Sequence, residues 1–169
     1  MFYSVYFSPT WKIFLESEDE KALSVLKFDG RSELCENATL SEELPVFLET
    51  KKWLDLYFSG KVPCFMPDLN PQGTKFSSSV WEILKTVPYG KTISYGEIAG
   101  IIAKNRGIAK MSAQAVGRAV GKNPIPIIIP CHRVIGANGD LTGFSCGLDI
   151  KIALLDIESK LKNPNFVPL

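Results

Sequence analysis

The chain has 169 residues, of which 46% are hydrophobic and 22% are charged, and its formal net charge is +1. This composition is typical of a soluble globular protein, and no apolar run approaches the roughly 20 residues that span a bilayer. Residues 1–10 have neither a basic start nor a long apolar stretch. We therefore expect no signal peptide, no membrane partner and a cytoplasmic location.

Charge is distributed unevenly along the chain. Residues 1–74 carry seven Lys/Arg against twelve Asp/Glu, whereas residues 75–169 carry twelve against six. Within residues 75–133, nine basic residues face only Glu82 and Glu97. A basic half indicates a phosphate-bearing partner, although many solvated protein faces are also basic.

The N-terminal part is predicted to form short strands followed by one helix. β-rich segments separated by turn residues predict strands at 2–7, 12–16 and 22–28, and the spacing of apolar residues predicts a helix at 44–58. Prolines punctuate residues 60–73, which we interpret as a linker. We expect an N-terminal α/β domain with its linker at 1–73 and a second domain at 74–169.

The second domain is predicted to begin with three helices. Thr74 can cap a helix at 75–86, and Ser94 with Glu97 fits a capping box for a helix that reaches about residue 103. A basic loop at 104–110 follows, and Ser112 begins a short helix that ends near residue 120. The last two helices are compatible with a helix-turn-helix, although their loop is longer than usual.

The next segment combines a stiff backbone with reactive side chains. Apolar residues at 125–129 predict a short strand that ends at Cys131, and prolines at 124, 126 and 130 restrict its backbone. Asn138-Gly139 is a signal for a two-residue hairpin, and residues 148–159 predict a final amphipathic helix.

Cys131 lies beside His132, the one histidine of the chain. A thiol nucleophile needs partial access, a local base and a fixed direction of attack. Adjacent residues of an extended chain point to opposite sides, so we expect His132 to act on Cys131 through a water. Glu158, on the inward line of the final helix, is the candidate acceptor for the far imidazole nitrogen. The alternative without chemistry is a small buried cysteine and a satisfied core histidine.

Cysteine spacing argues against a metal centre. None of the four cysteines forms a C-x-x-C pair, and one histidine cannot complete a Cys/His zinc cluster. Without a secretion signal, the thiols are expected to be reduced.

Several motifs together resemble those of the O6-alkylguanine-DNA alkyltransferases. The sequence Pro130-Cys-His-Arg-Val134, preceded by Asn123-Pro124, is similar to the active-site motif of that family. The other similar stretches are Val80-Trp81 and residues 87–99, 112–121, 142–148 and 151–158. Together they cover about residues 75–160, and the N-terminal part matches in layout only.

The resemblance implies an α+β fold, with a small N-terminal sheet-and-helix domain and a mainly helical, winged-helix-like C-terminal domain. It implies DNA repair by a single-turnover methylated-DNA--[protein]-cysteine S-methyltransferase. A monomer would bind the minor groove of double-stranded DNA and rotate O6-alkylguanine, and also O4-alkylthymine, out of the stack. The alkyl group would pass irreversibly to Cys131, with no cofactor.

The resemblance also implies individual roles. Cys131 is the nucleophile, His132 takes its proton through a water, Glu158 orients the imidazole, and Tyr95 donates to guanine N3. Ser145 would hydrogen-bond O6, and the carbonyls of residues 131 and 134 would read the exocyclic amine. Arg133 is expected to be structural. The implied substrate-binding residues are Asn123, Val134, Phe144, Ser145 and Cys146, and the implied DNA-binding residues are Ser112, Ala113, Gln114, Gly117, Arg118 and Lys122.

Three positions depart from the family pattern. Gln114 stands where many members have an arginine that fills the gap left by the flipped base, so we expect weaker or more salt-tolerant DNA binding, compensated by Arg118 or Lys122. Phe144 stands where tyrosine is frequent. Cys146 replaces a glycine beside the pocket and is expected to narrow it.

Three other functions would leave distinct signs. A cysteine hydrolase would turn over and release product. A damage sensor that lacks chemistry would not need the reactive cysteine that is present here. A transcription factor would bind undamaged DNA sequence-specifically.

Overall fold

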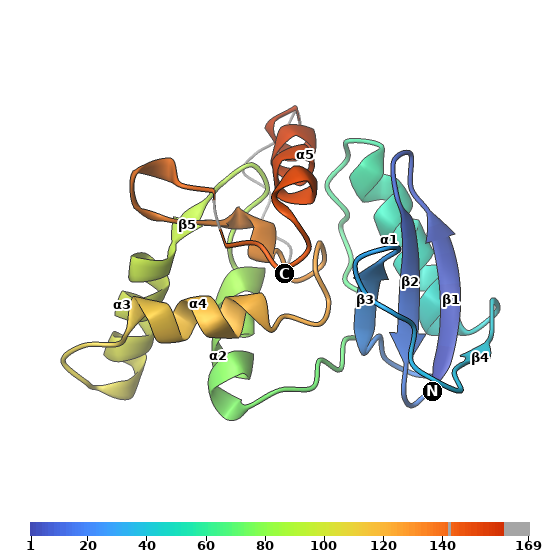
Figure 1. Ribbon diagram of the computed structural model, residues 1–169, viewed down its shortest axis with the longest axis horizontal. Helices are drawn as coiled ribbons and strands as arrows, with labels where there is room; N and C mark the ends of the chain where they lie inside the picture. The colour runs from blue at the N-terminus through green and yellow to red at the C-terminus, as the bar shows by residue number, and fades with distance from the viewer. Residues whose placement is uncertain (142, 161–169) are drawn as a thin grey trace. The chain divides into compact units, whose positions relative to one another are not determined.

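The computed structural model describes residues 1–141 and 143–160, and the chain divides into two compact units (Figure 1). The first unit comprises Met1–Gln72 and the second begins at Gly73. Among the described residues, no helix is long and apolar enough to cross a membrane. Residues 161–169, which belong to the second predicted domain, lie outside the described part.

The first unit is a four-stranded sheet with one helix along a face, as Figure 1 shows. The sheet order is β3-β2-β1-β4, with β1 antiparallel to β2, β2 antiparallel to β3, and β4 parallel to β1. Ile13 and Leu15 of the sheet and Phe47 and Leu54 of the helix are fully buried. The elements are β1 (Phe2–Phe7), β2 (Lys12–Ser17), β3 (Val25–Phe28), β4 (Thr39–Leu40) and α1 (Pro45–Phe58).

Three features of this unit differ from the prediction. β3 begins at Val25 rather than residue 22, because Leu23 instead forms an isolated parallel bridge with Leu69. The amide of Leu23 donates to the carbonyl of Asp68 at 2.8 Å, so part of the predicted linker at 60–73 packs within the first unit. β4 has only two residues and carries no local pattern from which it could be predicted.

The second unit is built around three mutually packed helices, α2 (Lys75–Lys85), α3 (Tyr95–Arg106) and α4 (Ala113–Gly121). The predicted caps are confirmed. Thr74 accepts from the Ser77 amide, Ser94 and Glu97 form a complete capping box, and Ser112 accepts from the Ala115 amide. The indole of Trp81 in α2 donates to the carbonyl of Ala119 in α4 at 2.9 Å, which fixes the contact between these helices.

The predicted start of the basic loop at residue 104 is wrong, because α3 continues to Arg106. Gly107 then ends the helix in the left-handed conformation, with φ of 64°. Glycine adopts this conformation without a steric penalty, and it is the usual residue after a helix. Residues 107–112 therefore join the two helices of the helix-turn-helix.

The predicted strand before Cys131 is also wrong. Residues 124–129 form bends around a turn at 126–128, in which the Ile129 amide donates to the Ile125 carbonyl and Ile127 has a φ of 72°. The prolines at 124, 126 and 130 lack the amide that a strand ladder requires. Cys131–Arg133 then forms a single 3₁₀ turn. The nucleophile candidate therefore lies on a turn and not on extended chain.

The prediction of a hairpin at Asn138-Gly139 is confirmed for the turn but wrong for the strands on either side of it. Both residues have positive φ, and the Asp140 amide donates to the Ala137 carbonyl. The preceding strand β6 (Val134–Ile135) pairs in parallel with β5 (Ile93–Ser94), and among the described residues it pairs with no other strand. The final helix α5 (Leu148–Ser159) has the predicted bounds.

Candidate active site

Cys131 is buried at the start of its 3₁₀ turn, where its side chain is held by Asn123. The amide nitrogen Nδ2 of Asn123 donates to Sγ of Cys131 at 3.1 Å and to the Ile129 carbonyl at 2.7 Å. Its Oδ1 accepts from the Ile125 amide at 3.1 Å. Asn123 lies two residues after the end of α4 at Gly121, so one side chain connects the end of that helix to the sulfur.

The surroundings of Cys131 keep its thiol protonated until a base removes the proton. Burial raises the pKa of Cys131 to about 12, while the hydrogen bond from Asn123 and the charge of Lys151 act in the opposite direction. The nearby thiol of Cys146 raises it further. A thiol of this kind reacts as a nucleophile only when the site stabilises its thiolate.

The neighbouring residues His132 and Arg133 share one carboxylate, that of Glu158 in α5. Nε2 of His132 lies 2.6 Å from Oε1 of Glu158, and Nε of Arg133 donates to Oε2 at 2.9 Å. Nη1 of Arg133 also donates to the Val87 carbonyl at 2.5 Å, and the guanidinium lies 4.2 Å from the ring centre of Tyr89. Glu158 is thereby fixed from two sides in the interior.

These contacts set the protonation state of the group. Burial alone would raise the pKa of Glu158, but the hydrogen bonds from His132 and Arg133 and the charge of Arg133 outweigh it and hold the pKa far below its usual range. Burial lowers the pKa of His132, and the charge of Glu158 opposes this only in part because Arg133 already compensates that carboxylate. His132 is therefore a neutral imidazole near pH 7, oriented through Nε2, with Nδ1 as the atom that can accept a proton.

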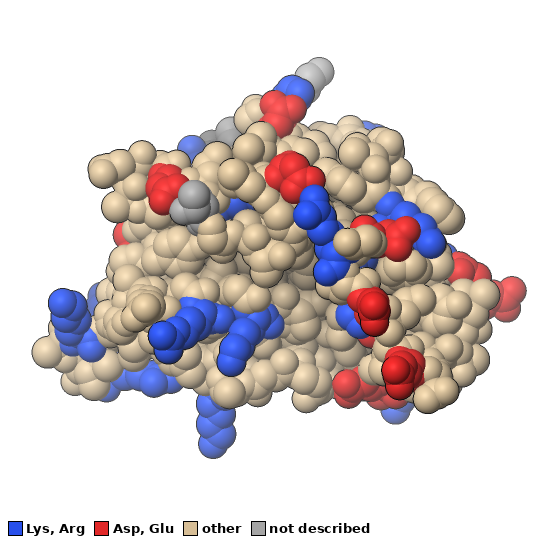
Figure 2. Space-filling view, in the orientation of Figure 1, with Lys and Arg blue, Asp and Glu red and all other residues tan. Residues whose placement is uncertain are grey.

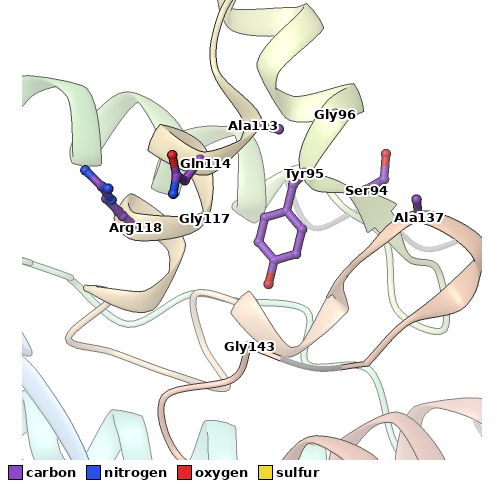
Figure 3. A pocket seen from close by; sticks show the side chains of 9 residues that line it. All are labelled: Ser94, Tyr95, Gly96, Ala113, Gln114, Gly117, Arg118, Ala137 and Gly143. Atoms are coloured by element: carbon purple, nitrogen blue, oxygen red, sulfur yellow. The ribbon is translucent and has the colours of Figure 1, made fainter.

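A pocket of about 720 Å³ lies between α3, α4 and the loops before α5, and Figure 3 shows the Tyr95 side chain projecting into it. A Cβ added to Gly143 would lie 3.3 Å from the Tyr95 hydroxyl, so that loop passes very near the phenol. Burial raises the pKa of Tyr95, and so do the charges of Cys131 and Asp140. The lining residues are Ser94, Tyr95, Gly96, Ala113, Gln114, Gly117, Arg118, Ala137 and Gly143.

The structure brings together only some of the predicted DNA-binding residues. Ala113, Gln114, Gly117 and Arg118 line the Tyr95 pocket, whereas Ser112 caps α4. Lys122 lies outside this pocket, and with Arg118 it lines a second pocket of about 220 Å³ at the start of α2. Figure 2 shows Lys and Arg side chains gathered over the region that Figure 1 draws as α2, α3 and α4.

Of the predicted substrate loop at 142–148, Gly143 lines that pocket, whereas Phe144, Ser145 and Cys146 are not among its lining residues. Ser145 is exposed, Phe144 and Cys146 are half-buried, and Oγ of Ser145 lies 4.0 Å from Sγ of Cys146. The carbonyl of Val134 accepts a hydrogen bond from Nζ of Lys151 at 2.7 Å. Thr142, which belongs to the same motif, lies outside the described residues.

Lys151 is the site residue that the sequence analysis missed. Its side chain is fully buried in the first turns of α5. Lys151 precedes Glu158 by seven residues, which is two helical turns, so both lie on one face of α5. That spacing was the available signal, but lysine is so rarely buried that an exposed position was the natural expectation.

No metal site is present among residues 1–141 and 143–160, since no three His, Cys, Asp or Glu side chains there could hold an ion together. Cys35, Cys64, Cys131 and Cys146, all among the described residues, form no disulfide. The chemistry that the described residues support is attack by a buried sulfur, with proton transfer to an oriented neutral imidazole.

Comparison with known proteins gives consistent matches along the chain. Residues 75–160 match the family described as 6-O-methylguanine DNA methyltransferase, DNA binding domain, and residues 1–70 match its ribonuclease-like domain. A methylated-DNA--protein-cysteine methyltransferase of Methanosarcina acetivorans is 46% identical over 94% of this chain and 98% of its own length. One of the same name from Haemophilus influenzae is 37% identical over 94% of this chain and 86% of its own.

Solved structures give the same result. The Mycobacterium tuberculosis OGT in complex with DNA is similar with a TM-score of 0.81 and 39% identity, covering 94% of this chain and 93% of that one. The M. tuberculosis O6-methylguanine methyltransferase is similar with a TM-score of 0.82 and 37% identity, covering 97% and 96% of the two chains.

Proposed function

Because the chain belongs to the O6-methylguanine DNA methyltransferase family, whose members repair DNA by direct alkyl transfer to a cysteine, we propose that Cys131 is its alkyl acceptor. The observation that carries this proposal is the placement of the Cys131 sulfur, which is held by Asn123 beside the buried His132–Glu158 pair. Of the four cysteines, Cys35 and Cys64 are exposed and belong to the first unit, and Cys146 lies on a loop.

The first step is removal of the thiol proton. His132 is neutral and Nδ1 is the nitrogen that is not bonded to Glu158, so the proton passes from Sγ to Nδ1 through a water. Glu158 stabilises the imidazolium that forms, and Arg133 keeps that carboxylate ionised and in place. These two residues are positioning residues, because they act through His132.

The second step is a single displacement at the alkyl carbon. The S–C bond forms as the C–O6 bond breaks, and the electron pair of that bond remains on the guanine. Tyr95 donates a proton to N3, so that the base leaves neutral, and the imidazolium returns its proton to the phenolate through solvent. The negative charge of the Cys131 thiolate that forms in the first step raises the pKa of Tyr95, and alkylation removes that charge, so the phenol becomes a better acid as the base leaves.

The base is held by groups around the nucleophile. We assign Ser145 to O6 and the carbonyls of Cys131 and Val134 to the exocyclic amine of guanine, with Phe144 and Cys146 as walls of the pocket. The Val134 carbonyl has two lone pairs, so its bond to Lys151 leaves one for the base. O4-alkylthymine presents an analogous alkyl oxygen and is the second substrate that we propose.

The second unit presents α4 to the minor groove, and the target base leaves the stack to reach Cys131. Its basic residues meet the phosphates, and Gln114 with Arg118 occupies the wall of the Tyr95 pocket. The residues proposed to contact DNA are Ser112, Ala113, Gln114, Gly117, Arg118 and Lys122. We propose that the protein acts in the cytoplasm as a monomer without a cofactor.

The test is mass spectrometry of the protein after incubation with a duplex oligonucleotide that contains one O6-methylguanine. We expect one added methyl group, located on the peptide that contains Cys131, and no further turnover. Cys131→Ser should accept none, while the matched control Cys64→Ser should behave as the wild type. Demethylation with an unmodified protein, or a methyl group on another cysteine, would overturn the assignment.

A further inference from the structure

One short turn contacts the active site although it contains no group that reacts. It lies between α2 and β5, where the Lys91 amide donates to the Pro88 carbonyl at 3.1 Å. Gly90 has a φ of 68°, a left-handed conformation that several turn types require at their third residue. The turn exposes Gly90 and buries the side chain of Tyr89.

This segment contacts Glu158 and the arginine that pairs with it in three ways. The amide of Gly90 donates to Oε2 of Glu158 at 3.1 Å. Cζ of Arg133 lies over the Tyr89 ring, 4.2 Å from its centre. The Val87 carbonyl, one residue before the turn, accepts from Nη1 of Arg133 at 2.5 Å. Four consecutive residues therefore hold both the carboxylate and its cation.

The position of Arg133 matters because this side chain shares an acceptor with the imidazole. Oε1 of Glu158 accepts from Nη2 of Arg133 at 2.9 Å and lies 2.6 Å from Nε2 of His132. A guanidinium presents five N–H donors, so it can bind the same carboxylate in more than one orientation. If it shifted toward Oε1, His132 would lose the acceptor that selects its tautomer. The imidazole is therefore oriented only as well as the guanidinium is held.

Tyr89 supplies the contact that fixes the plane of the guanidinium. A cation over an aromatic ring is attracted by the negative face of the ring, and the attraction is stronger where both groups are shielded from water. Arg133 is 3% exposed and Tyr89 is 2% exposed, so this contact is shielded. Burial raises the pKa of Tyr89, and the charge of Arg133 opposes this in part, as expected for a neutral phenol beside a guanidinium.

We propose that Tyr89 is a positioning residue for alkyl transfer, whose ring holds Arg133 in the orientation that keeps Oε1 of the shared carboxylate available to His132. This inference rests on the proposed roles of Cys131 and His132. Tyr89 touches no reacting atom and takes part in no bond change. The thiol proton still passes through a water to Nδ1 of His132, and the ring acts on that step through Arg133 and Glu158, by fixing which imidazole nitrogen is free to accept.

The test uses NMR of the isotope-labelled protein without a tag. The chain has a single histidine, so the ring nitrogens of His132 are observed without overlap. In a proton–nitrogen correlation spectrum, one fixed tautomer gives two well-separated ring nitrogen signals, whereas exchange between tautomers brings them together. Tyr89→Met fills much of the space without a ring, and Tyr89→Phe keeps the ring. We expect one tautomer, with hydrogen on Nε2, in the wild type and in Tyr89→Phe, and exchange in Tyr89→Met.

The same variants are compared by single-turnover methyl transfer from an O6-methylguanine duplex. We expect Tyr89→Met to react about tenfold more slowly, because part of the molecules carry hydrogen on the wrong ring nitrogen, and Tyr89→Phe to stay within about twofold of the wild type. The matched control is Phe28→Met, which replaces an equally buried ring of the first unit. It should lower the melting temperature and leave both the tautomer and the rate unchanged.

Two results would overturn the inference. One is a folded Tyr89→Met in which either the tautomer or the rate stays that of the wild type, because a ring that only fills space changes stability and not the base. The other is an equal loss in Tyr89→Phe, which would assign the effect to the hydroxyl and not to the ring face.

If Tyr89→Met does not fold, a trifluorinated phenylalanine at position 89 takes its place. It keeps the ring and weakens the negative charge of its face, so exchange between tautomers supports the contact with Arg133, and a spectrum like that of Tyr89→Phe refutes it. The NMR measurement needs no DNA. Failure of methyl transfer in a wild type with one fixed tautomer would therefore sink the proposed function separately.

Discussion

Oε1 of Glu158 lies 2.6 Å from Nε2 of His132, and both side chains are fully buried. The same carboxylate binds Arg133. Two residues of the active-site turn therefore depend on one acceptor from α5. Removing the charge of that acceptor should affect both the chemistry and the fold.

Glu158→Gln leaves the guanidinium of Arg133 buried without its anion and removes the group that orients the imidazole. We expect a loss of stability of about 3–5 kcal/mol, as for one half of a buried ion pair, and methyl transfer about 100-fold slower. Urea unfolding and single-turnover transfer from an O6-methylguanine duplex measure the two effects. Asp156→Asn, which removes an exposed charge of the same helix, is the control and should change neither quantity appreciably.

Stability should also depend on pH through His132. Its pKa is lowered in the folded protein, chiefly by burial, so the unfolded chain binds a proton more readily. The stability that the folded protein has while His132 is neutral is fully present above pH 6.5, the ordinary pKa of histidine, and is lost as the pH falls below this value. Because the chain has no other histidine, unfolding free energy should fall by at most about 1.4 kcal/mol per pH unit between pH 6.5 and 5.5.

The measurement is urea unfolding at half-unit pH steps from 7.5 to 5.5. His132→Asn has no group that titrates in this window at that position and should give a flatter profile. A wild-type profile that is equally flat would mean that His132 is not held neutral by its surroundings.

Asn123 should control the placement of the sulfur. Asn123→Ala leaves the Ile125 amide and the Ile129 carbonyl without their buried partner and removes the bond to Cys131 Sγ. The expected loss is about 1–3 kcal/mol of stability, with methyl transfer slowed because the thiol is no longer fixed. Thermal melting and transfer kinetics report the two effects. Asn105→Ala, at an exposed position of α3, should leave both unchanged.

Most features of the fold and the site that depend on residues close together in the sequence could be predicted, and most features that depend on distant residues could not. The caps at Thr74, Ser94 and Ser112 were predicted because a cap depends on residues within one helical turn. The His132–Glu158 contact was predicted from the inward line of α5. The turns before Cys131 were not predicted. The apolar residues of that segment suggested a strand, but its prolines lack the amide that a strand ladder requires. The Lys151–Val134 contact could not be predicted, because it depends on how α5 packs against a segment that lies 17 residues earlier in the chain.

Cys146 should restrict the size of the adduct that the site accepts. It is half-buried, and its thiol raises the pKa of Cys131. Cys146→Gly removes the Cβ and the sulfur, and we expect reactivity with O6-benzylguanine to rise at least tenfold while methyl transfer changes little. Equal benzylguanine reactivity in both proteins would contradict the narrowed pocket. Cys64→Gly, in the first unit, is the control for loss of a thiol elsewhere.

Gln114 should make DNA binding weaker and less dependent on salt than an arginine at the same position. Gln114 lines the Tyr95 pocket on α4, so Gln114→Arg adds a charge where the duplex is proposed to lie. Each additional phosphate contact raises the slope of log affinity against log salt by about 0.9. We therefore expect tighter binding at low salt and a slope steeper by about one contact, measured by fluorescence anisotropy with a labelled duplex. Ser32→Arg adds the same charge at an exposed position of the first unit, and an equal change in both variants would show that net charge alone, and not position 114, sets the affinity.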